Sequence, residues 1–216
     1  MGESLLALQM KTPTSPWVFS FDTILFMHNA VIFDFFGVFC PDISLEWFKK
    51  TVPQFELKLS RFKDICTRSD YGKLSMADFY EEVSTLVGMN VSEIKHGVEA
   101  ETIINNSLVT FVQGLKDKGY AIVCLSNGTQ EWTLGVIRDN GLSYLFDEVV
   151  LSGDLGIVKP SSEIYMHTLD KLNITASQAI FVDDRLVNTK AAEACGISSL
   201  VFSDTKTFIH EFEAIS

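Results

Sequence analysis

Five short apolar runs constrain the fold of this chain more than any other feature of its sequence. They cover residues 30–33, 121–125, 148–151, 179–182 and 199–202. The runs are rich in Val, Ile and Phe and lack the polar alternation of a half-exposed strand, so each predicts a strand buried on both faces of a parallel sheet. Segments with helical spacing lie between these runs. Strands that alternate with helices predict an α/β fold, a doubly wound parallel sheet.

The interval 43–107 breaks this alternation, because it contains helical patterns and no convincing strand. One apolar stripe at helical spacing begins after Ser75 and ends at Gly88. An all-helical insertion after the first strand would lie above the carboxyl ends of the strands, where open α/β sheets bind ligands. We therefore expect three parts: an N-terminal extension over residues 1–29, a Rossmann-like core over 30–42 and 108–216, and a helical cap over 43–107.

The predicted extension contains an apolar stretch, residues 17–27, that raises the question of a signal peptide. Lys11 is the only basic residue before this stretch, Asp22 interrupts the stretch, and no small-residue cleavage pattern follows it. No span in the sequence approaches the roughly 18 apolar residues that a transmembrane helix requires. We expect the extension to pack as an extra strand or to stay flexible, with Met27 as an alternative start.

The composition excludes several classes of partner. A net charge of −11 opposes binding to nucleic acid and to anionic membranes, because both are bound through basic patches. The four cysteines lack C-x-x-C spacing and the four histidines are scattered singly, which predicts reduced thiols, a cytoplasmic protein and no zinc site. An anionic ligand must then be held by a few local cations, a metal ion or backbone amides.

Polar residues follow four of the predicted strands, at or close to the point where each strand ends. They are Asp34, Ser126, Asn127, Gly128, Lys159, Asp183 and Asp184. Because a parallel sheet brings the carboxyl ends of its strands to one edge, we expect these residues to meet. A carboxylate nucleophile, donors for phosphate oxygens, a lysine and a carboxylate pair suited to a hard cation would then surround one point.

At these positions the chain resembles the haloacid dehalogenase-like superfamily. FDFFGV at 33–38, LSNG at 125–128, the Lys159-Pro160 pair and FVDDRLVN at 181–188 are similar, in order, to its four sequence motifs. The resemblance covers about residues 30–203. It implies a Rossmann-like core with a helical cap inserted after the first motif, and Mg²⁺-dependent hydrolysis of a phosphomonoester through an aspartyl-phosphate intermediate.

The resemblance also implies a role for each residue of the motifs. Asp34 would be the nucleophile and a Mg²⁺ ligand, and Lys159 would balance the negative charge of Asp34 and phosphate. The other Mg²⁺ ligands would be the backbone carbonyl of Phe36 and the carboxylate of Asp183, with Asp184 assisting. The residues that would bind the phosphoryl group of the substrate, besides Lys159, are Ser126, Asn127 and Gly128.

One residue departs from the family pattern. Most phosphatases of this superfamily carry a second Asp two residues after the nucleophile, and it protonates the leaving group and then activates water. This chain has Phe36 there, which does neither. General acid–base catalysis typically contributes 10²–10⁴-fold, so we expect rates that depend steeply on the pKa of the leaving group, unless a residue of the predicted cap supplies the acid.

Two other functions fit part of the pattern. A hydrolytic 2-haloacid dehalogenase would use Asp34 without a metal, and an aromatic residue at position 36 is compatible with it. Asp183 and Asp184 would then face a carboxylate substrate without a cation between them, which favours Mg²⁺ and phosphate. A catalytically weak phosphate-binding module that has lost its acid is the third interpretation.

The sequence leaves specificity open. We expect a small phosphorylated metabolite as the ligand, but neither the particular ester nor the oligomeric state follows from these residues. Four basic residues in the predicted cap are candidates for substrate contact, although basic side chains on exposed helix faces are usually solvated. They are Arg61, Lys63, Arg68 and Lys73.

Overall fold

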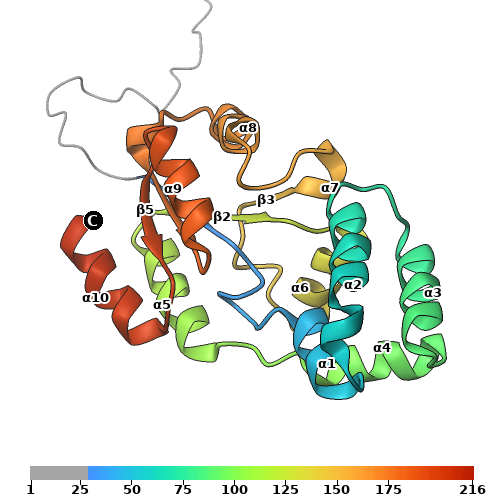
Figure 1. Cartoon of the computed structure of the whole chain (residues 1–216). Helices are drawn as coiled ribbons and strands as arrows, with labels where there is room; N and C mark the ends of the chain where they lie inside the picture. The colour runs from blue at the N-terminus through green and yellow to red at the C-terminus, as the bar shows by residue number, and fades with distance from the viewer. Residues whose placement is uncertain (1–28) are drawn as a thin grey trace, which may run out of the picture.

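The structure is a computed structural model that describes residues 29–216 (Figure 1). The predicted extension, apart from its last residue, and the alternative start at Met27 lie outside the described residues. Within them, a single sheet of five parallel strands has the order β3-β2-β1-β4-β5. The strands are β1 (Ala30–Phe33), β2 (Ala121–Ser126), β3 (Glu148–Leu151), β4 (Ala179–Asp183) and β5 (Ser198–Val201). The predicted doubly wound sheet is confirmed.

The burial of the strands differs between the centre and the edges of the sheet. All residues of β1 and β4 are buried, as are all but the first of β2. Edge strand β5 is only partly covered, and Val201 is 38% exposed. The expectation of burial on both faces therefore holds for the three central strands and is wrong for the edge, because an edge strand has neighbours on one side only.

Helices and short turns connect the strands. The α-helices are α1 (Ile43–Thr51), α2 (Phe55–Asp70), α3 (Met76–Val87), α4 (Val91–Ala100), α5 (Asn106–Asp117), α6 (Gly135–Asp139), α7 (Ser152–Leu155), α8 (Ser162–Leu172), α9 (Leu186–Ala194) and α10 (Thr205–Ile215). A π-helical turn, η1 (Gln130–Leu134), precedes α6, and a 3-10 turn, η2 (Ala176–Gln178), precedes β4. No helix in residues 29–216 is long and apolar enough to cross a membrane.

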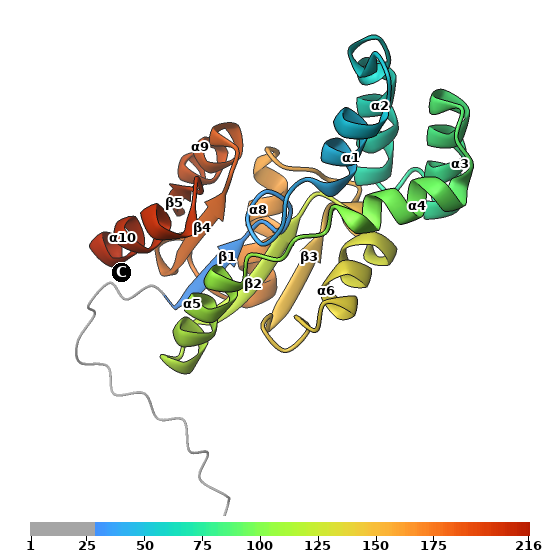
Figure 2. The ribbon, with the colours of Figure 1, turned by 90° about the horizontal axis from the view of Figure 1, so that it is seen from below.

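The two faces of the sheet contribute to two separate hydrophobic clusters. Alternate residues of β1 point to opposite faces: Val31 and Phe33 belong to one cluster and Ile32 to the other. The first cluster includes residues of α5 and α10, and the second includes residues of α8 and α9. Figure 2 shows these helices on the two sides of the strands. The sheet is therefore the middle layer of three.

The helices α1 to α4 follow β1 without an intervening strand and lie together (Figure 1). The Ser75 hydroxyl caps α3 by accepting a hydrogen bond from the Asp78 N–H, and α3 ends at Gly88, whose φ of 79° suits a glycine. The predicted helical character of this interval is confirmed. Its division from the rest of the chain, as a cap over residues 43–107, stays a prediction.

Helix α4 approaches α1 closely at a glycine. A Cβ atom on Gly97 would lie 2.4 Å from Nε1 of Trp47, and Trp47 is only 2% exposed. A side chain at position 97 would therefore press on a large buried ring that has little room to move.

Because of this contact, we expect glycine-to-alanine changes in two helices to alter the free energy of unfolding in opposite directions. Alanine is favoured over glycine in a helix by about 1 kcal/mol, but overpacking of a core costs about 1–3 kcal/mol. We expect Gly97→Ala to lower the free energy of unfolding by roughly 1–2 kcal/mol. The matched control is Gly114→Ala in α5, where the new Cβ meets nothing within 4 Å, and it should raise the free energy by up to about 1 kcal/mol. Urea unfolding checks both, and a stabilised Gly97→Ala would contradict the packing described.

Candidate active site

Asp34 lies directly after β1, the central strand of the sheet. The order of the strands reverses between β1 and β4, and open α/β sheets bind ligands at such a switch point. The carboxylate is buried, and its Oδ1 accepts a hydrogen bond from the Phe35 N–H at 2.7 Å. The chain turns away at Gly37, whose φ of 92° is unfavourable for other residues. The strand therefore delivers one fixed carboxylate to the switch point.

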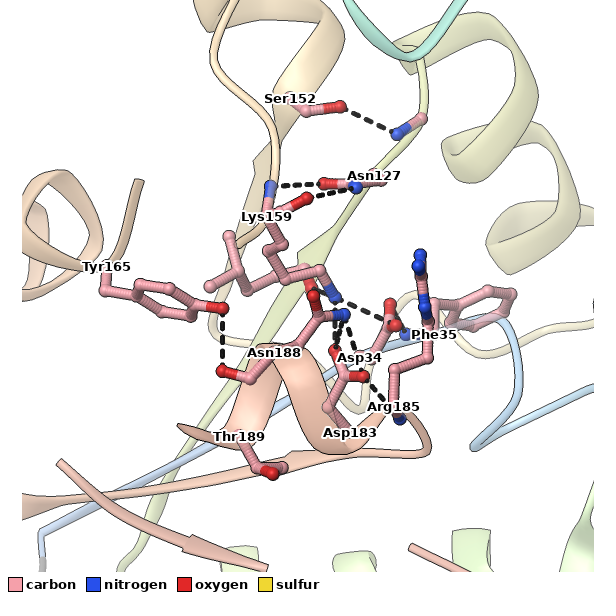
Figure 3. A network of polar contacts seen from close by, with 12 residues as sticks. Asp34, Phe35, Asn127, Ser152, Lys159, Tyr165, Asp183, Arg185, Asn188 and Thr189 are labelled. Atoms are coloured by element: carbon pink, nitrogen blue, oxygen red, sulfur yellow. Dashed lines mark hydrogen bonds and ion pairs between the residues drawn. The ribbon is translucent and has the colours of Figure 1, made fainter. Parts of the chain in front are cut away.

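Lys159 joins three of the strand ends (Figure 3). Its Nζ lies 2.8 Å from Oδ2 of Asp34, 2.8 Å from Oδ2 of Asp183 and 2.8 Å from the carbonyl oxygen of Leu125. An ammonium group has three protons, so these three acceptors use all of them. The side chain is almost completely buried. One cation thus holds two buried carboxylates together; we call this arrangement the lysine clamp.

Asp183 is anchored more firmly than Asp34. Its Oδ1 accepts hydrogen bonds from the Arg185 N–H and from Nδ2 of Asn188, each at 2.9 Å. Asn188 Nδ2 also lies 3.0 Å from Oδ2 of Asp183. Both donors come from the start of α9, so the helix fixes the carboxylate that ends β4.

The two carboxylates of the clamp differ in their electrostatics. Burial raises the pKa of Asp34 above its usual range, and the negative charge of Asp183 adds to the rise, although Lys159 opposes it. Burial also acts to raise the pKa of Asp183, but Lys159 and the hydrogen bonds from Arg185 and Asn188 outweigh it and hold that pKa low. The pKa of Lys159 is raised, because its two carboxylate partners outweigh its burial. Asp183 and Lys159 therefore hold their charges firmly, and Asp34 is the group whose protonation responds to its surroundings.

Three carboxylates are placed as ligands for a cation. Asp34, Asp183 and Asp184 each offer an oxygen, and these oxygens all lie within 4.8 Å of one another. The Asp184 side chain lies against Gly37, where a Cβ would be 2.4 Å from its Cγ. Carboxylate oxygens are the donors that Mg²⁺ prefers, so this group fits that ion. Gly37 thus serves both the turn after Asp34 and the position of Asp184.

The predicted phosphate-binding residues lie beside the clamp but are not equivalent. Ser126 is buried, and within residues 29–216 its hydroxyl has no hydrogen-bond partner. The amide of Asn127 instead brackets the main chain of Lys159, accepting from its N–H at 2.8 Å and donating to its carbonyl at 3.1 Å. The Gly128 N–H donates to Oγ of Ser152 at 3.0 Å. An unpaired buried hydroxyl is costly, so Ser126 fits a bound phosphoryl oxygen best.

Phe36 points its ring toward aromatic neighbours. It is half-buried, and its ring stacks on Trp132 at 6.2 Å between centroids and meets Phe35 edge-on at 5.1 Å. Trp132 in turn contacts Tyr80 of α3 at 6.5 Å. An aromatic wall therefore runs from the strand end to the helical interval. We define this aromatic wall as Phe36, Trp132 and Tyr80.

A cavity of about 40 Å³ lies between the helices and the loop after β2. Its lining combines apolar and polar side chains, and among them Asp70 is the one carboxyl and there is no lysine or arginine. The lining residues are Ser44, Cys66, Ser69, Asp70, Met76, Phe79, Gly128, Thr129 and Trp132. The cavity therefore connects the helical interval with residues next to Ser126.

The basic residues of the helical interval do not line this cavity. Arg61 and Arg68 line a larger hollow of about 520 Å³ between α2 and α3. There Nη1 of Arg68 donates to Glu82 at 2.8 Å, and Nε donates to Asp64 at 3.0 Å. Lys63 and Lys73 are exposed. The charge of Arg68 is thus balanced by acidic neighbours on the same helices.

Sequence reasoning missed three residues of this site. Asn188 stands in the FVDDRLVN segment, and its position in that segment, five residues after Asp183, was a usable signal. Ser152 and Asp70 carried no signal, because each acts through a contact between distant parts of the chain: Ser152 Oγ donates to the Asp70 carbonyl at 2.6 Å across 82 positions.

Comparison with known proteins supports the family resemblance of the four motifs. The family model of haloacid dehalogenase-like hydrolases matches residues 28–196. The chain belongs to that family. It therefore carries the hydrolase fold that its four motifs indicated, and the clamp lies where those motifs come together.

Named relatives include phosphatases. The chain is 29% identical over 138 residues to the sesquiterpene phosphatase astK of Aspergillus oryzae, a match that covers 62% of this chain and 70% of that protein. It is 27% identical over 131 residues to bifunctional epoxide hydrolase 2 of Rattus norvegicus, covering 59% of this chain but only 24% of the relative. The chain therefore corresponds to a small part of that larger protein.

Solved structures share the fold. A HAD family enzyme of Bacteroides thetaiotaomicron, in complex with magnesium and inorganic phosphate, superimposes with a TM-score of 0.71 at 20% identity, covering 84% of this chain and 98% of the other. An L-2-haloacid dehalogenase superimposes with a TM-score of 0.62 at 19% identity, covering 81% and 84%. At these identities the similarity shows the fold alone.

The lysine clamp predicts how stability depends on pH when Lys159 is removed. Lys159→Met leaves two buried carboxylates unpaired, which typically costs about 3–5 kcal/mol. Their folded-state pKa values then rise, so the folded state binds more protons than the unfolded state, and stability falls as pH rises. In urea unfolding with EDTA we expect a larger loss at pH 8 than at pH 5.

The control for that change is Lys171→Met, which removes a surface pair with Glu148 at 3.1 Å. Exposed pairs contribute about 0–1 kcal/mol, so its effect should be small at both pH values. An effect of Lys159→Met that is equal at pH 5 and pH 8 would show that the clamp does not carry the described charges.

Proposed function

We propose that this protein is a Mg²⁺-dependent phosphomonoester hydrolase that forms an aspartyl-phosphate on Asp34. The observation that carries the proposal is the lysine clamp beside the carboxylate group of Asp34, Asp183 and Asp184. A phosphate dianion approaches a carboxylate only where positive charge cancels the repulsion. The site has one buried cation in place and oxygen donors arranged for another.

Magnesium fits the donors on their chemistry. Asp34, Asp183 and Asp184 would hold it, together with the main-chain carbonyl of Phe36 that the family resemblance implies. A bound Mg²⁺ would neutralise phosphate charge and orient the phosphoryl group. The magnesium and phosphate in the related Bacteroides structure support this assignment.

The chain's own residues account for the chemical steps. An Asp34 carboxylate oxygen attacks phosphorus, and the bond between phosphorus and the leaving oxygen breaks. Lys159 neutralises charge on Asp34 and on the phosphoryl oxygens, while the buried Ser126 hydroxyl donates to one of those oxygens. Water then attacks the aspartyl-phosphate, releasing inorganic phosphate and restoring the carboxylate.

Dehalogenation is the second candidate, because an L-2-haloacid dehalogenase shares the fold. A 2-haloacid carries its own carboxylate, which the cavity would have to accept next to Asp70 and without a lysine or arginine in its lining. Asp183 and Asp184 add negative charge at the strand ends. These charges favour a phosphate ester over a haloacid.

The same cavity indicates a neutral leaving group. Met76, Phe79 and Trp132 give it an apolar side, and no cation in its lining would bind a second anionic group of the substrate. The related sesquiterpene phosphatase is named for an apolar substrate class, which supports this preference. We therefore propose esters whose alcohol part is apolar, of a size that the helical interval admits.

The basic activity has a direct test. With Mg²⁺, we expect turnover of p-nitrophenyl phosphate by the wild-type protein, loss of that turnover in EDTA, and at least a 10³-fold loss in Asp34→Asn, because the amide is no nucleophile. Release of p-nitrophenol measures the rate, and Asp64→Asn, at an exposed position of α2, is the matched control. Halide release from 2-chloropropionate, with no phosphate release, would instead establish the dehalogenase.

The preference for an apolar leaving group is tested at Trp132. Phenyl phosphate should be a better substrate than phosphoglycolate, whose carboxylate finds no cation in the cavity. Trp132→Ala should raise KM for phenyl phosphate about tenfold, since an aromatic contact contributes about 0.5–1.5 kcal/mol. Inhibition by inorganic phosphate, which has no leaving group, should not change. A preference for phosphoglycolate would overturn this substrate class.

A further inference from the structure

Asp70 is the last residue of α2 and lies on the wall of the 40 Å³ cavity. Gly128 and Thr129, which follow the buried Ser126, line the same cavity. Within residues 29–216 the Asp70 carboxylate has no hydrogen bond and no ion pair, although its main-chain carbonyl is bound by Ser152. The carboxyl group is therefore free to contact a molecule in the cavity.

The position of Asp70 is fixed by contacts that cross the fold. Oγ of Ser152 donates to the Asp70 carbonyl at 2.6 Å and accepts from the Gly128 N–H at 3.0 Å. Two residues later, Gly72 lies so close to α7 that a Cβ would be 2.1 Å from the Gly153 carbonyl oxygen. The end of α2 is thus tied to the loop that carries the predicted phosphate-binding residues.

The charges around Asp70 come from three other elements. Asp42 at the start of α1 adds negative charge, while Lys159 and Arg185, which precede α8 and α9, add positive charge. Burial and Asp42 raise the pKa of Asp70 to about 7, against the opposing effect of the two cations. Lys159 therefore acts on the two carboxylates of the lysine clamp and also lowers the pKa of this carboxyl. A sizeable fraction of Asp70 is therefore protonated at neutral pH.

Among the residues 29–216 that line the cavity, no other side chain is suited to donate a proton. Asp70 is its one carboxyl, and the pKa of the Cys66 thiol is raised by burial. Phe36, where most related phosphatases carry the acid, has no exchangeable proton and packs in the aromatic wall. The cavity thus holds one acid beside the loop that follows Ser126, and its Trp132 stacks on Phe36, the residue at the family's usual acid position.

We infer that Asp70 is the general acid of this enzyme and replaces the carboxyl that is absent at Phe36. The inference rests on the proposed phosphatase activity. As Asp34 attacks phosphorus and the leaving oxygen departs, the Asp70 carboxyl gives its proton to that oxygen, so a neutral alcohol is released. The resulting Asp70 carboxylate then takes a proton from the water that attacks the aspartyl-phosphate, which restores both aspartates.

A series of phosphate esters with different leaving groups tests this assignment. General acids contribute about 10²–10⁴-fold, but a leaving group that is stable as an anion needs little help. We expect Asp70→Asn to lower kcat for phenyl phosphate at least 100-fold and kcat for p-nitrophenyl phosphate less than 10-fold. Asp64→Asn, on the same helix but paired with Arg68, is the control and should change neither.

The pH profile supplies an independent measurement. For phenyl phosphate, the wild-type kcat/KM should fall above about pH 7, as Asp70 loses its proton. In Asp70→Asn this alkaline decline should be absent, and the dependence of rate on leaving-group pKa should become steeper than in the wild type. A residue that only positions its neighbours would lower all the rates without moving the profile.

The possible results separate the two proposals. Suppose that the wild type turns over both esters and that Asp34→Asn abolishes this turnover. If Asp70→Asn then lowers kcat equally for both esters, or lowers neither, the role of Asp70 is overturned and the phosphatase stands. Absence of wild-type turnover on every ester would overturn the phosphatase itself. Retained p-nitrophenyl phosphate turnover in Asp70→Asn shows that the variant is folded.

Discussion

The ion pairs that Lys159 makes with two buried carboxylates are the interactions on which the rest of this site depends. Asp34 and Asp183 end adjacent strands and would repel each other strongly in a buried place. Their cation comes from a third segment of the chain, whose main chain is held by the Asn127 side chain. The strand order, the loop after β2 and the segment before α8 must therefore all be correct before the charges balance.

The helical interval matters because two of its helices contact the segments that lie beside these charges. Its contact with α7 through Ser152 joins Asp70 to the loop after β2. The aromatic wall joins α3 to Phe36, two residues after Asp34. The helices thus bring an apolar surface and one carboxyl to a site whose strand ends offer only charge and hydrogen bonds. A phosphatase whose first motif lacks its usual acid can keep its chemistry if that surface supplies one.

Much of the fold followed from the pattern of apolar residues. The strands β1 to β4 begin where the apolar runs predict, and β5 begins one residue earlier, because buried parallel strands leave a continuous signal. Edge exposure of β5 did not follow, since strand order depends on how the helices cross the sheet. Asn127 and Gly128 were predicted as phosphate donors from their residue types, but their side chain and N–H make contacts within the protein that residue type does not reveal.

The sequence by itself determined which chemical groups stand at the strand ends and in what order, because each motif is local and directly follows an apolar run. The tertiary structure decided what surrounds them. Asp70 precedes Ser152 by 82 positions, and no local pattern marks it as different from other acidic residues on helices. Its partial burial, its raised pKa and its place on the cavity wall arise only when the helices pack over the sheet. Asp34 is thus a residue that the sequence identifies, and Asp70 one that only the folded chain does.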